Sequence, residues 1–363
     1  MRDEDARLYA ELEGRLRAAG LGRVLDELLA LARPAISLGL TRVDEATIPI
    51  GASKVGGTAD LPPAAEWPSW LGRPLPFIAQ ARLEEVAALD PEGDLPHRGL
   101  LSFFYAINDP DGSLHVRDGT IHWQVIYTAD ATTLERRPLP EALVGGLETA
   151  FPACAVAPVR RLTLPPNENE LADARGFTND ERLALIGVVG GASVGFDELM
   201  DHRLLGYPYT LDSPHPFLEG YLAHNGIERP MPPGDPEQQR ERYQRAMATL
   251  REAAQEWRPP IGGYQTPDDV WRAMADFQSR ADMAPLRRAL NDLEPTPPPL
   301  DFQARMAALE RAADAEWRLL LQVYSNGEAE MDWAGGGVIH FGIARADLAA
   351  RDFSRVWVNL DFL

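Results

Sequence analysis

The chain alternates between stretches whose apolar residues recur at helical spacing and stretches built from short, β-rich runs. Residues 1–33 place apolar side chains three and four positions apart, and Arg33-Pro34 stops that pattern. We predict a helical hairpin there, within an N-terminal segment of residues 1–40. Residues 235–317 contain three segments with helical spacing, separated by proline and glycine breaks. This second helical stretch predicts an insertion at about those residues.

The remaining stretches predict strands. Short runs rich in β-branched and aromatic residues, separated by turn residues, are typical of antiparallel strands. These runs are Leu75–Leu83, Leu100–Ile107, Ile121–Tyr127, Cys154–Leu164, Arg318–Tyr324, Val338–Ala344 and Val356–Phe362, with a short helix expected at Ala346–Ala350. We therefore predict an α+β fold with two mostly antiparallel β modules. The first spans residues 41–165, and the second spans residues 166–363 and carries the helical insertion.

The two β modules repeat each other in order. A polar residue, a cation, a glycine turn and a proline occur in both, and two strand segments follow in each. The matching pairs are Ser53–Pro62 with His202–Pro208, Pro76–Gln80 with Leu319–Val323, and Arg98–Phe104 with Gly336–Phe341. Matches in the same order predict an internal duplication. Two such copies would pack about a pseudo-twofold axis, since neither could bury its apolar face alone.

Seven segments form an ordered set that is more specific than any one of them. They are Ala32–Leu38, Ser53–Gly57, Glu66–Pro68, Gly72–Gln80, His202–Pro208, Trp317–Gln322 and Arg351–Trp357. The set resembles the YwqG-like family of bacterial proteins, which implies an α+β fold and no agreed substrate. The chain departs from the family pattern at Ala59, where proline is usual, and at Trp333–Gly337, where the family tends to read Trp-Gly-Asp-x-Gly. The missing acid argues against a mechanism that needs a carboxylate at that turn.

The charge balance narrows the range of partners. The net charge of −20 disfavours nucleic acid and anionic membranes, because both are recruited by positive potential. The longest mostly apolar run, Leu183–Phe196, is broken by glycines and too short to span a bilayer. Cys154 is the one cysteine, which excludes an internal disulfide and suits a reducing compartment. We expect a cytoplasmic protein with no nucleic-acid or membrane partner.

One motif suggests catalysis. Gly191–Gly195 matches the G-x-S-x-G pattern, in which a serine, here Ser193, stands on a sharp turn from strand to helix. The apolar run Leu183–Val189 before it reads as a strand, and His202 and His215, each with a nearby aspartate, follow in the expected order. However, the short spacing to His202 leaves little room for the helix behind such a serine. A hydrolase using Ser193 with His202 or His215 is therefore the alternative hypothesis.

Metal and phosphate motifs are missing. The seven histidines form no His-x-His and no His-Glu-x-x-His pattern, and a single cysteine excludes thiolate zinc sites. Lys54 precedes its glycine pair, whereas the lysine of a phosphate-binding loop follows the glycines. We therefore expect no metal and no other cofactor, and we assign no catalytic residue.

Lys54 is the most unusual single residue. Of the 35 lysines and arginines in the chain, it alone is lysine, and it lies in the glycine-rich stretch Gly51–Gly57. A position that keeps a compact ammonium in a chain biased toward arginine needs a point charge. That charge could face a ligand, or it could face backbone carbonyls and one carboxylate inside the fold. We favour the structural interpretation.

The two glycine turns and the aromatic residues beside them form the candidate binding surface. Aromatic side chains with a few converging polar groups suit a small-molecule or peptide cleft. The candidate residues are Lys54, Gly56, Gly57, Trp67, Gln80, Arg203, Gly206, Tyr207, Gln322 and Trp333. The function we predict is a non-catalytic module that binds an unknown protein or small molecule.

Overall fold

The computed structural model describes residues 2–106, 122–144, 151–165, 176–189, 202–210, 215–230, 244–245, 248–249 and 300–362. The chain divides into one unit made of residues 1–228 and 309–363 and a second made of residues 229–308. Only short pieces of the second unit are described, and most of the predicted insertion lies outside the described residues. The fold below is that of the first unit, which we call the body.

The described helices include one pair at the N-terminus, as the apolar spacing predicted. They are α1 (Arg2–Ala18), α2 (Leu25–Leu31), α3 (Leu83–Val86), α5 (Asn179–Val189), α6 (Leu218–Asn225), α10 (Leu300–Glu316) and α11 (Arg345–Ala350). Short 3-10 helices occur at η1 (Gly22–Val24), η2 (Glu45–Thr47), η3 (Ala87–Leu89), η4 (Glu141–Leu143) and η6 (Phe353–Arg355). No helix in the described part of the chain is both long and apolar enough to cross a membrane.

Each of the seven predicted runs overlaps a strand, and the structure has further strands elsewhere. The strands are β1 (Arg33–Arg42), β2 (Lys54–Val55), β3 (Asp60–Leu61), β4 (Ser69–Trp70), β5 (Arg73–Pro74), β6 (Phe77–Arg82), β7 (Leu100–Tyr105), β8 (Trp123–Thr128), β9 (Glu135–Arg136), β10 (Cys154–Thr163), β11 (Arg203–Leu205), β12 (Trp317–Tyr324), β13 (Val338–Ala344) and β14 (Trp357–Asp361). One prediction was wrong, because Leu183–Val189 belongs to helix α5 rather than to a strand. A short apolar run without clear alternation fits either element.

The N-terminal hairpin ends on a well-defined helix cap. Gly20 takes a left-handed φ of 82°, its N–H bonds Arg17 O, and the N–H of Leu21 bonds Leu16 O. These two bonds form a Schellman motif, which satisfies the last carbonyls of α1. After α2, Ala32 is already extended, as expected close to a proline. Strand β1 starts at Arg33, so the boundary predicted at residue 40 lies within this strand.

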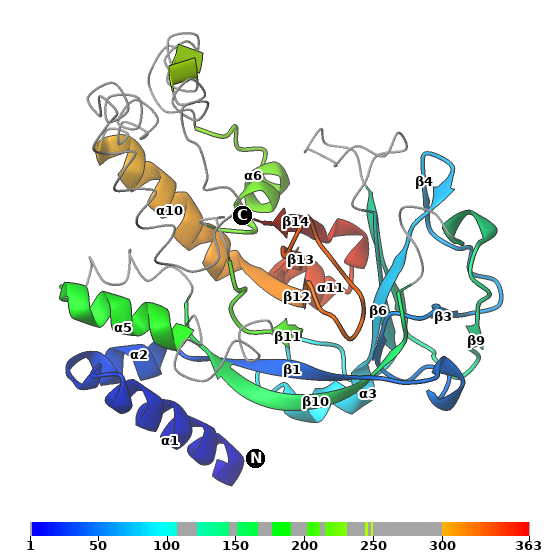
Figure 1. Cartoon of the computed structure of the whole chain (residues 1–363), viewed down its shortest axis with the longest axis horizontal. Helices are drawn as coiled ribbons and strands as arrows, with labels where there is room; N and C mark the ends of the chain where they lie inside the picture. The colour runs from blue at the N-terminus through cyan, green and yellow to red at the C-terminus, as the bar shows by residue number, and fades with distance from the viewer. Residues whose placement is uncertain are drawn as a thin grey trace, which may run out of the picture. The chain divides into compact units, whose positions relative to one another are not determined.

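The described part of the body contains one ten-stranded antiparallel sheet, in the order β14-β13-β12-β11-β1-β10-β2-β6-β7-β8. Its centre is the pair of long strands β1 and β10, which run side by side from Arg33 opposite Thr163 to Arg42 opposite Cys154 (Figure 1). β11 adds to the free edge of β1, and β2 adds to the free edge of β10. The central pair therefore carries two four-stranded arms. The α+β class and the antiparallel sheet agree with the prediction.

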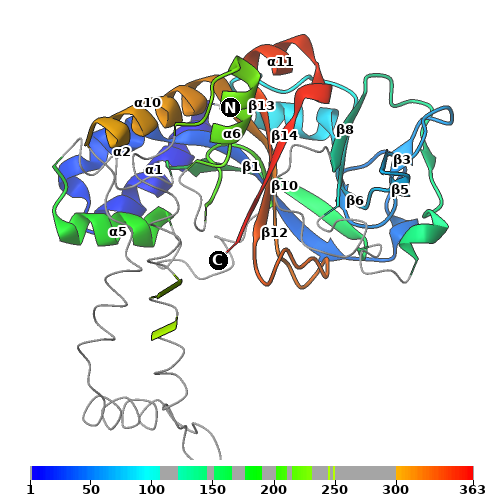
Figure 2. The same cartoon turned by 90° about the horizontal axis from the view of Figure 1, so that it is seen from above.

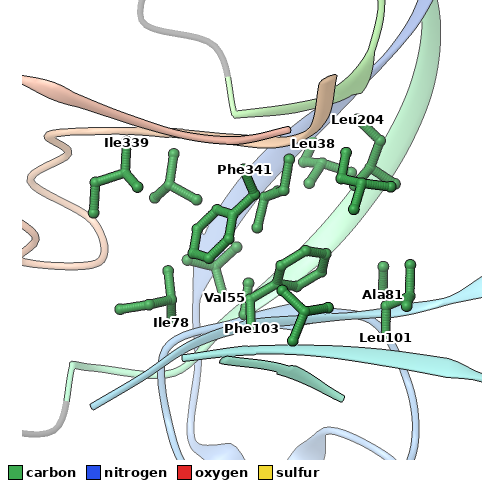
Figure 3. Packing of buried hydrophobic residues seen from close by; sticks show 14 of the residues in the cluster. Leu38, Val55, Ile78, Ala81, Leu101, Phe103, Leu204, Ile339 and Phe341 are labelled. Carbon is green, nitrogen blue, oxygen red and sulfur yellow. The ribbon is translucent and has the colours of Figure 1, made fainter. Parts of the chain in front are cut away.

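The apolar faces of the two arms meet in one core. β7 and β13, the third strand of each arm, are buried along their whole length. Phe103 of β7 and Phe341 of β13 lie edge to face, with ring centroids 5.1 Å apart. Figure 3 shows these rings, together with Ile78 and Ile339, filling the space between the arms. Burial of both aromatic rings contributes to the energy that holds the arms together.

The outer strands of the arms also approach each other. Trp123 of β8 donates its indole N–H to Val356 O at 2.8 Å and packs edge to face on Trp357 of β14. Tyr127 of β8 contacts Phe353 of η6. β8 and β14 are the two edge strands of the sheet. Because they contact each other, the sheet must curl around its core.

A second apolar cluster lies under the N-terminal helices. Leu16 of α1, Leu28 of α2 and Leu185 of α5 are fully buried in it, beside Leu164 just after β10. Figure 2 shows α1, α2 and α5 grouped at one end of the body, away from β3 and β5. The three helices therefore cover the end of the central pair at which β11 also joins the sheet.

The ring contact between the arms can be tested by a double-mutant cycle. We expect Phe341→Ala to lower the free energy of unfolding by about 3–5 kcal/mol, because it empties a fully buried ring position. Phe103→Ala should lower the free energy of unfolding less in the Phe341→Ala variant than in wild type, because the contact between the two rings is already lost there. Leu16→Ala, in the separate helical cluster, is the matched control and should add its full cost to that of Phe341→Ala. Urea unfolding measures all the variants. Full additivity between Phe103 and Phe341 would contradict this packing.

Candidate functional site

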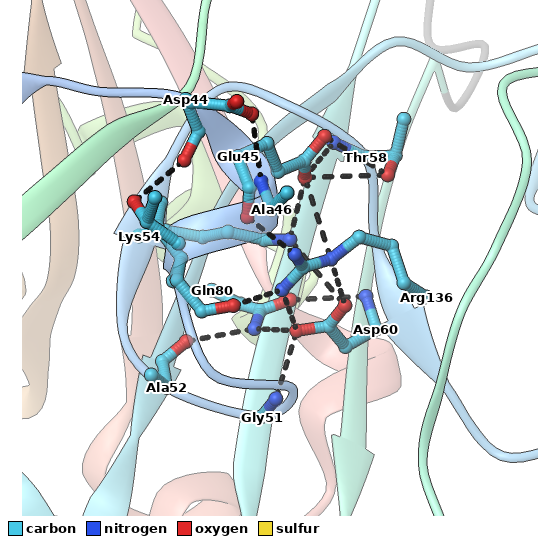
Figure 4. Close-up of polar contacts among 12 residues, drawn as sticks. Asp44, Glu45, Ala46, Gly51, Ala52, Lys54, Thr58, Asp60, Gln80 and Arg136 are labelled. Atoms are coloured by element: carbon cyan, nitrogen blue, oxygen red, sulfur yellow. Dashed lines mark hydrogen bonds and ion pairs between the residues drawn. The ribbon is translucent and has the colours of Figure 1, made fainter.

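The first glycine turn holds Lys54 in a closed polar cluster. The Lys54 side chain is 0% exposed, and its Nζ lies 2.8 Å from Glu45 Oε1 and 3.4 Å from Asp60 Oδ1. Lys54 stands opposite Gln80 in the β2–β6 register. Figure 4 shows these groups converging from η2, β2, β3 and β6. The sequence suggested carbonyls and one carboxylate around the ammonium, whereas the structure places two carboxylates there.

Asp60 is the most heavily bonded member of this cluster. It accepts hydrogen bonds from Gly51 N–H and Gln80 Nε2, each at 2.8 Å, and from Arg136 Nε at 2.9 Å. Burial alone would raise the pKa of the Asp60 carboxyl, but the Arg136 and Gly51 hydrogen bonds and the Lys54 charge outweigh it and hold that pKa below its usual value. Asp60 therefore stays ionised and neutralises the buried cations.

The geometry of the first turn explains its two glycines. Gly56 and Gly57 have φ of 70° and 74°, a left-handed conformation that L-residues with a Cβ rarely adopt. A Cβ on Gly56 would lie 2.1 Å from Pro152 O, and one on Gly57 would lie 2.4 Å from Glu45 Oε1. The turn is thus packed on every side. Lys54, Gly56, Gly57 and Gln80 form one structural unit.

The second glycine turn repeats the backbone of the first. Leu205 and Gly206 have φ of 60° and 72°, at the same offsets from Arg203 as the two glycines from Lys54. Arg203 stands opposite Gln322 in the β11–β12 register. Gln322 Oε1 accepts from Tyr209 N–H at 2.7 Å, as Gln80 Oε1 accepts from Asp60 N–H at 3.1 Å. Tyr209 lies six residues after Arg203 and Asp60 six after Lys54, so a tyrosine replaces the acid.

The second turn opens onto a cavity of about 300 Å³. Its walls come from β1, β10 and β11, from α1 and α5, and from the loop after β12. Arg203 and Tyr207 line it, and both side chains are buried, that of Arg203 being 8% exposed. Arg203 Nη1 donates to Tyr207 O at 3.4 Å. Of the ten candidate residues, only these two line the cavity.

His202 is the most unusual group in the cavity wall. Its side chain is 3% exposed, and neither Nδ1 nor Nε2 has a hydrogen-bond partner among the described residues. Burial lowers the pKa of His202 to about 4, so the ring is neutral at pH 7 and offers one donor and one acceptor. A buried polar side chain without partners is costly. A ligand in the cavity could supply those partners.

The two tryptophans of the candidate surface lie elsewhere. Trp67 donates its indole N–H to Leu75 O at 2.9 Å and packs on Phe104 in a small separate core. Trp333 is buried in the main core against Tyr105 and Phe151. The structure therefore distributes the candidate residues among the closed cluster, the cavity and two cores instead of gathering them on one surface.

Sequence reasoning missed the residues that surround both cations. Glu45 and Arg136 complete the Lys54 cluster from η2 and β9, and no motif links them to the glycine turn. Arg15 and Arg161 line the cavity from α1 and β10, again without any signal in spacing. Only the offset of Asp60 from Lys54, compared with that of Tyr209 from Arg203, was readable from the sequence.

The structure leaves the serine-hydrolase hypothesis untested at its central residue. Ser193 and the aspartates at 201 and 212 lie outside the described residues. The element before Ser193 is helix α5, whereas that motif requires a strand there. His215 Nδ1 accepts from Phe217 N–H at 3.3 Å. Within the described ranges, no group of three or more His, Cys, Asp or Glu side chains could hold a metal ion.

Comparison with known proteins gives a family but no activity. A family model described as a domain of unknown function (DUF1963) matches residues 53–361, a range that contains both glycine turns. A search of the curated proteins found no match. The likeness to the YwqG-like proteins in particular stays a prediction.

The closed cluster predicts a structural role for Lys54. We expect Lys54→Met to lower the free energy of unfolding by about 1–3 kcal/mol, because methionine keeps the stem but leaves buried carboxylate oxygens short of a donor. Urea unfolding measures this loss. In an Asp60→Asn background one buried negative charge is already removed. Lys54→Met should therefore lower the free energy of unfolding less there than in wild type. An unfolding midpoint equal to that of wild type would contradict the structural role.

His202 predicts a loss of stability in mild acid. An unfolded histidine takes up a proton near pH 6.5, whereas His202 in the fold does so only near pH 4, so the unfolded state binds more protons between these values. Stability should therefore fall as the pH drops through this window. We expect the free energy of unfolding, measured with urea, to fall between pH 7 and pH 4.5. This fall should be about 2–3 kcal/mol smaller in His202→Leu than in wild type. The control is the exposed His97 changed to Leu, which removes a histidine that does not line the cavity.

Proposed function

The chain belongs to this DUF1963 family of unknown function, and we propose that it is a non-catalytic binding module that takes a small ligand in the cavity beside Arg203. The observation that carries the proposal is the difference between the two glycine turns. The first turn surrounds its cation with Glu45 and Asp60. The second, with the same backbone conformation, opens onto a cavity. Concave sites with a few converging polar groups are typical of small-ligand binding.

The proposal includes an internal duplication. Each arm joins the central pair through a short strand that carries a cation, followed by a strand that carries glutamine opposite that cation. Gln80 stands opposite Ser102 in the first arm, and Gln322 stands opposite His340 in the second. Matching registers and matching left-handed turns support a common origin of the two arms. On this view one copy retained a structural turn and the other became the binding site.

The environment of His202 favours binding over catalysis. A general base is most effective when its pKa lies near the working pH, and burial lowers the pKa of His202 to about 4. The hydrolase using Ser193 with His202 or His215 remains the alternative. Loss of a measured hydrolase activity in Ser193→Ala would support that alternative. We also propose a cytoplasmic protein without nucleic-acid partners, because the net charge is −20.

Native mass spectrometry tests the proposed function. We expect protein isolated from its native host, or incubated with a small-molecule extract of that host, to carry a bound mass. Arg203→Met should remove this mass, because it deletes a charged group in the cavity wall. Arg345→Met is the matched control, since it also removes one positive charge but lies on an exposed position outside the cavity.

Two results would contradict the proposed function. One is wild-type protein with no bound mass after both treatments. The other is an Arg203→Met variant that folds normally and carries the same mass as wild type. Far-ultraviolet circular dichroism and the urea midpoint establish that each variant is folded before the binding comparison is made.

A further inference from the structure

We infer that the ligand of the Arg203 cavity is a small organic anion that also carries a hydroxyl or amide group. This inference rests on the proposed function and adds the chemical class of the ligand. It is built on three features of the cavity: the charge of its walls, the polar groups of His202 and its size.

Positive charge converges on the cavity from three separate elements. Among the described residues that line it, Arg15 of α1, Arg161 of β10 and Arg203 of β11 are cations and Glu328 is the one acid, a formal balance of three minus one, or +2. The whole chain carries −20, so this region opposes the sign of the protein around it. A cleft lined by one sign of charge concentrates ligands of the opposite sign. Guanidinium groups also match the oxygen pairs of carboxylates and phosphates.

The comparison with the first turn suggests where the anion binds. Asp60 approaches Lys54 from six residues further along the chain and neutralises it inside the fold. Tyr209 occupies that offset after Arg203 and also lines the cavity. A ligand carboxylate or phosphate beside Arg203 would bring a negative charge to this turn, as the Asp60 carboxylate does at Lys54.

The His202 ring adds a second requirement. As a neutral imidazole it has one N–H donor and one acceptor nitrogen, both buried and both without a partner among the described residues. Thr163 also lines the cavity, but its hydroxyl already donates to Arg33 O and accepts from Tyr207 N–H. A ligand hydroxyl or amide can both donate and accept, so it would satisfy His202.

The cavity volume limits the size of this anion. About 300 Å³ is at the lower end of the range for ligand pockets. Such a volume suits a hydroxy acid or a sugar phosphate and is too small for a nucleic-acid or protein segment. Apolar side chains, among them Leu12, Leu162 and Val188, form part of the wall. They strengthen the electrostatic attraction by keeping water away from it.

Matched probes test the inference by isothermal titration calorimetry. Malate and glucose 6-phosphate represent the carboxylate and phosphate sources of the anion, and malamide and glucose are their uncharged counterparts. We expect at least one anion to bind wild-type protein at least tenfold more tightly than its uncharged counterpart, with an affinity that falls as salt rises. The stronger of the two anions identifies the source. Arg203→Met should lose at least tenfold in this affinity, whereas Arg345→Met should lose none.

A comparison of the affinities for succinate and malate isolates the role of His202, because the two acids differ by one hydroxyl. We expect wild type to prefer malate over succinate by about tenfold, the effect of one hydrogen bond to a buried partner. His202→Leu should abolish this preference without lowering the urea midpoint at pH 7, since leucine leaves no buried nitrogen unpaired. A preference that survives in His202→Leu would remove His202 from the site.

Several outcomes would overturn the inference. Equal binding of charged and uncharged probes would show that the ligand class is wrong, and so would a co-purified mass that proves to be a neutral or cationic molecule. In either case the proposed function stands, provided that Arg203→Met still loses the co-purified mass. Anion binding that Arg203→Met leaves unchanged would place the anion elsewhere. If no probe binds and no mass co-purifies, both the inference and the proposed function fail.

Discussion

The antiparallel pairing of β1 with β10 is the constraint on which the rest of the body depends. These two strands pair along ten residues each, and each offers its outer edge to one arm of the sheet. In the strand registers, Ala155 of β10 stands opposite Lys54 of β2, and Ser37 of β1 stands opposite Arg203 of β11. A shift of one residue in the central register would turn every side chain to the opposite face. It would therefore displace both cations from their surroundings at once.

The two turns solve the same electrostatic problem differently. A buried cation loses its hydration, and this loss is offset only by close counter-charges or by hydrogen bonds. At Lys54 the protein supplies the carboxylates of Glu45 and Asp60, and Arg136 and the Gln80 amide in turn donate hydrogen bonds to Asp60. At Arg203 the same backbone faces a cavity wall with further arginines. On the proposed function, a rigid structural turn and a site for an outside molecule share one local fold.

The sequence predicted the elements whose patterns are local. β13 has the predicted bounds, and β6, β7, β10, β12 and β14 lie within one or two residues of theirs. The apolar run at Leu183–Val189 was assigned to the wrong element, because buried helix and buried strand look alike over so few residues. The central role of β1 was also missed. Its register with β10 joins residues more than a hundred positions apart, and no local pattern encodes that distance.

The surroundings of the two glycine turns could not be predicted from the sequence, for the same reason. Lys54 and Arg203 were found because glycine turns leave a signature in the sequence, but the residues that close one turn and open the other come from distant segments. Glu45, Arg136, Arg15 and Arg161 are ordinary charged residues until the fold brings them to these positions. The one readable difference was an acid at residue 60 against a tyrosine at residue 209. The proposed distinction between a closed structural turn and an open binding turn rests on that difference.

The most direct test transfers the acid of the first turn to the second. Tyr209→Asp would give Arg203 the carboxylate at the offset from which Asp60 reaches Lys54, and Tyr209→Asn is the uncharged control of nearly the same shape. Malate affinity, measured by titration calorimetry on folded protein, should fall at least tenfold further in Tyr209→Asp than in Tyr209→Asn, because the internal carboxylate competes for Arg203. Equal affinities in the two variants would contradict the view that the two turns are equivalent and differ in the source of their anion.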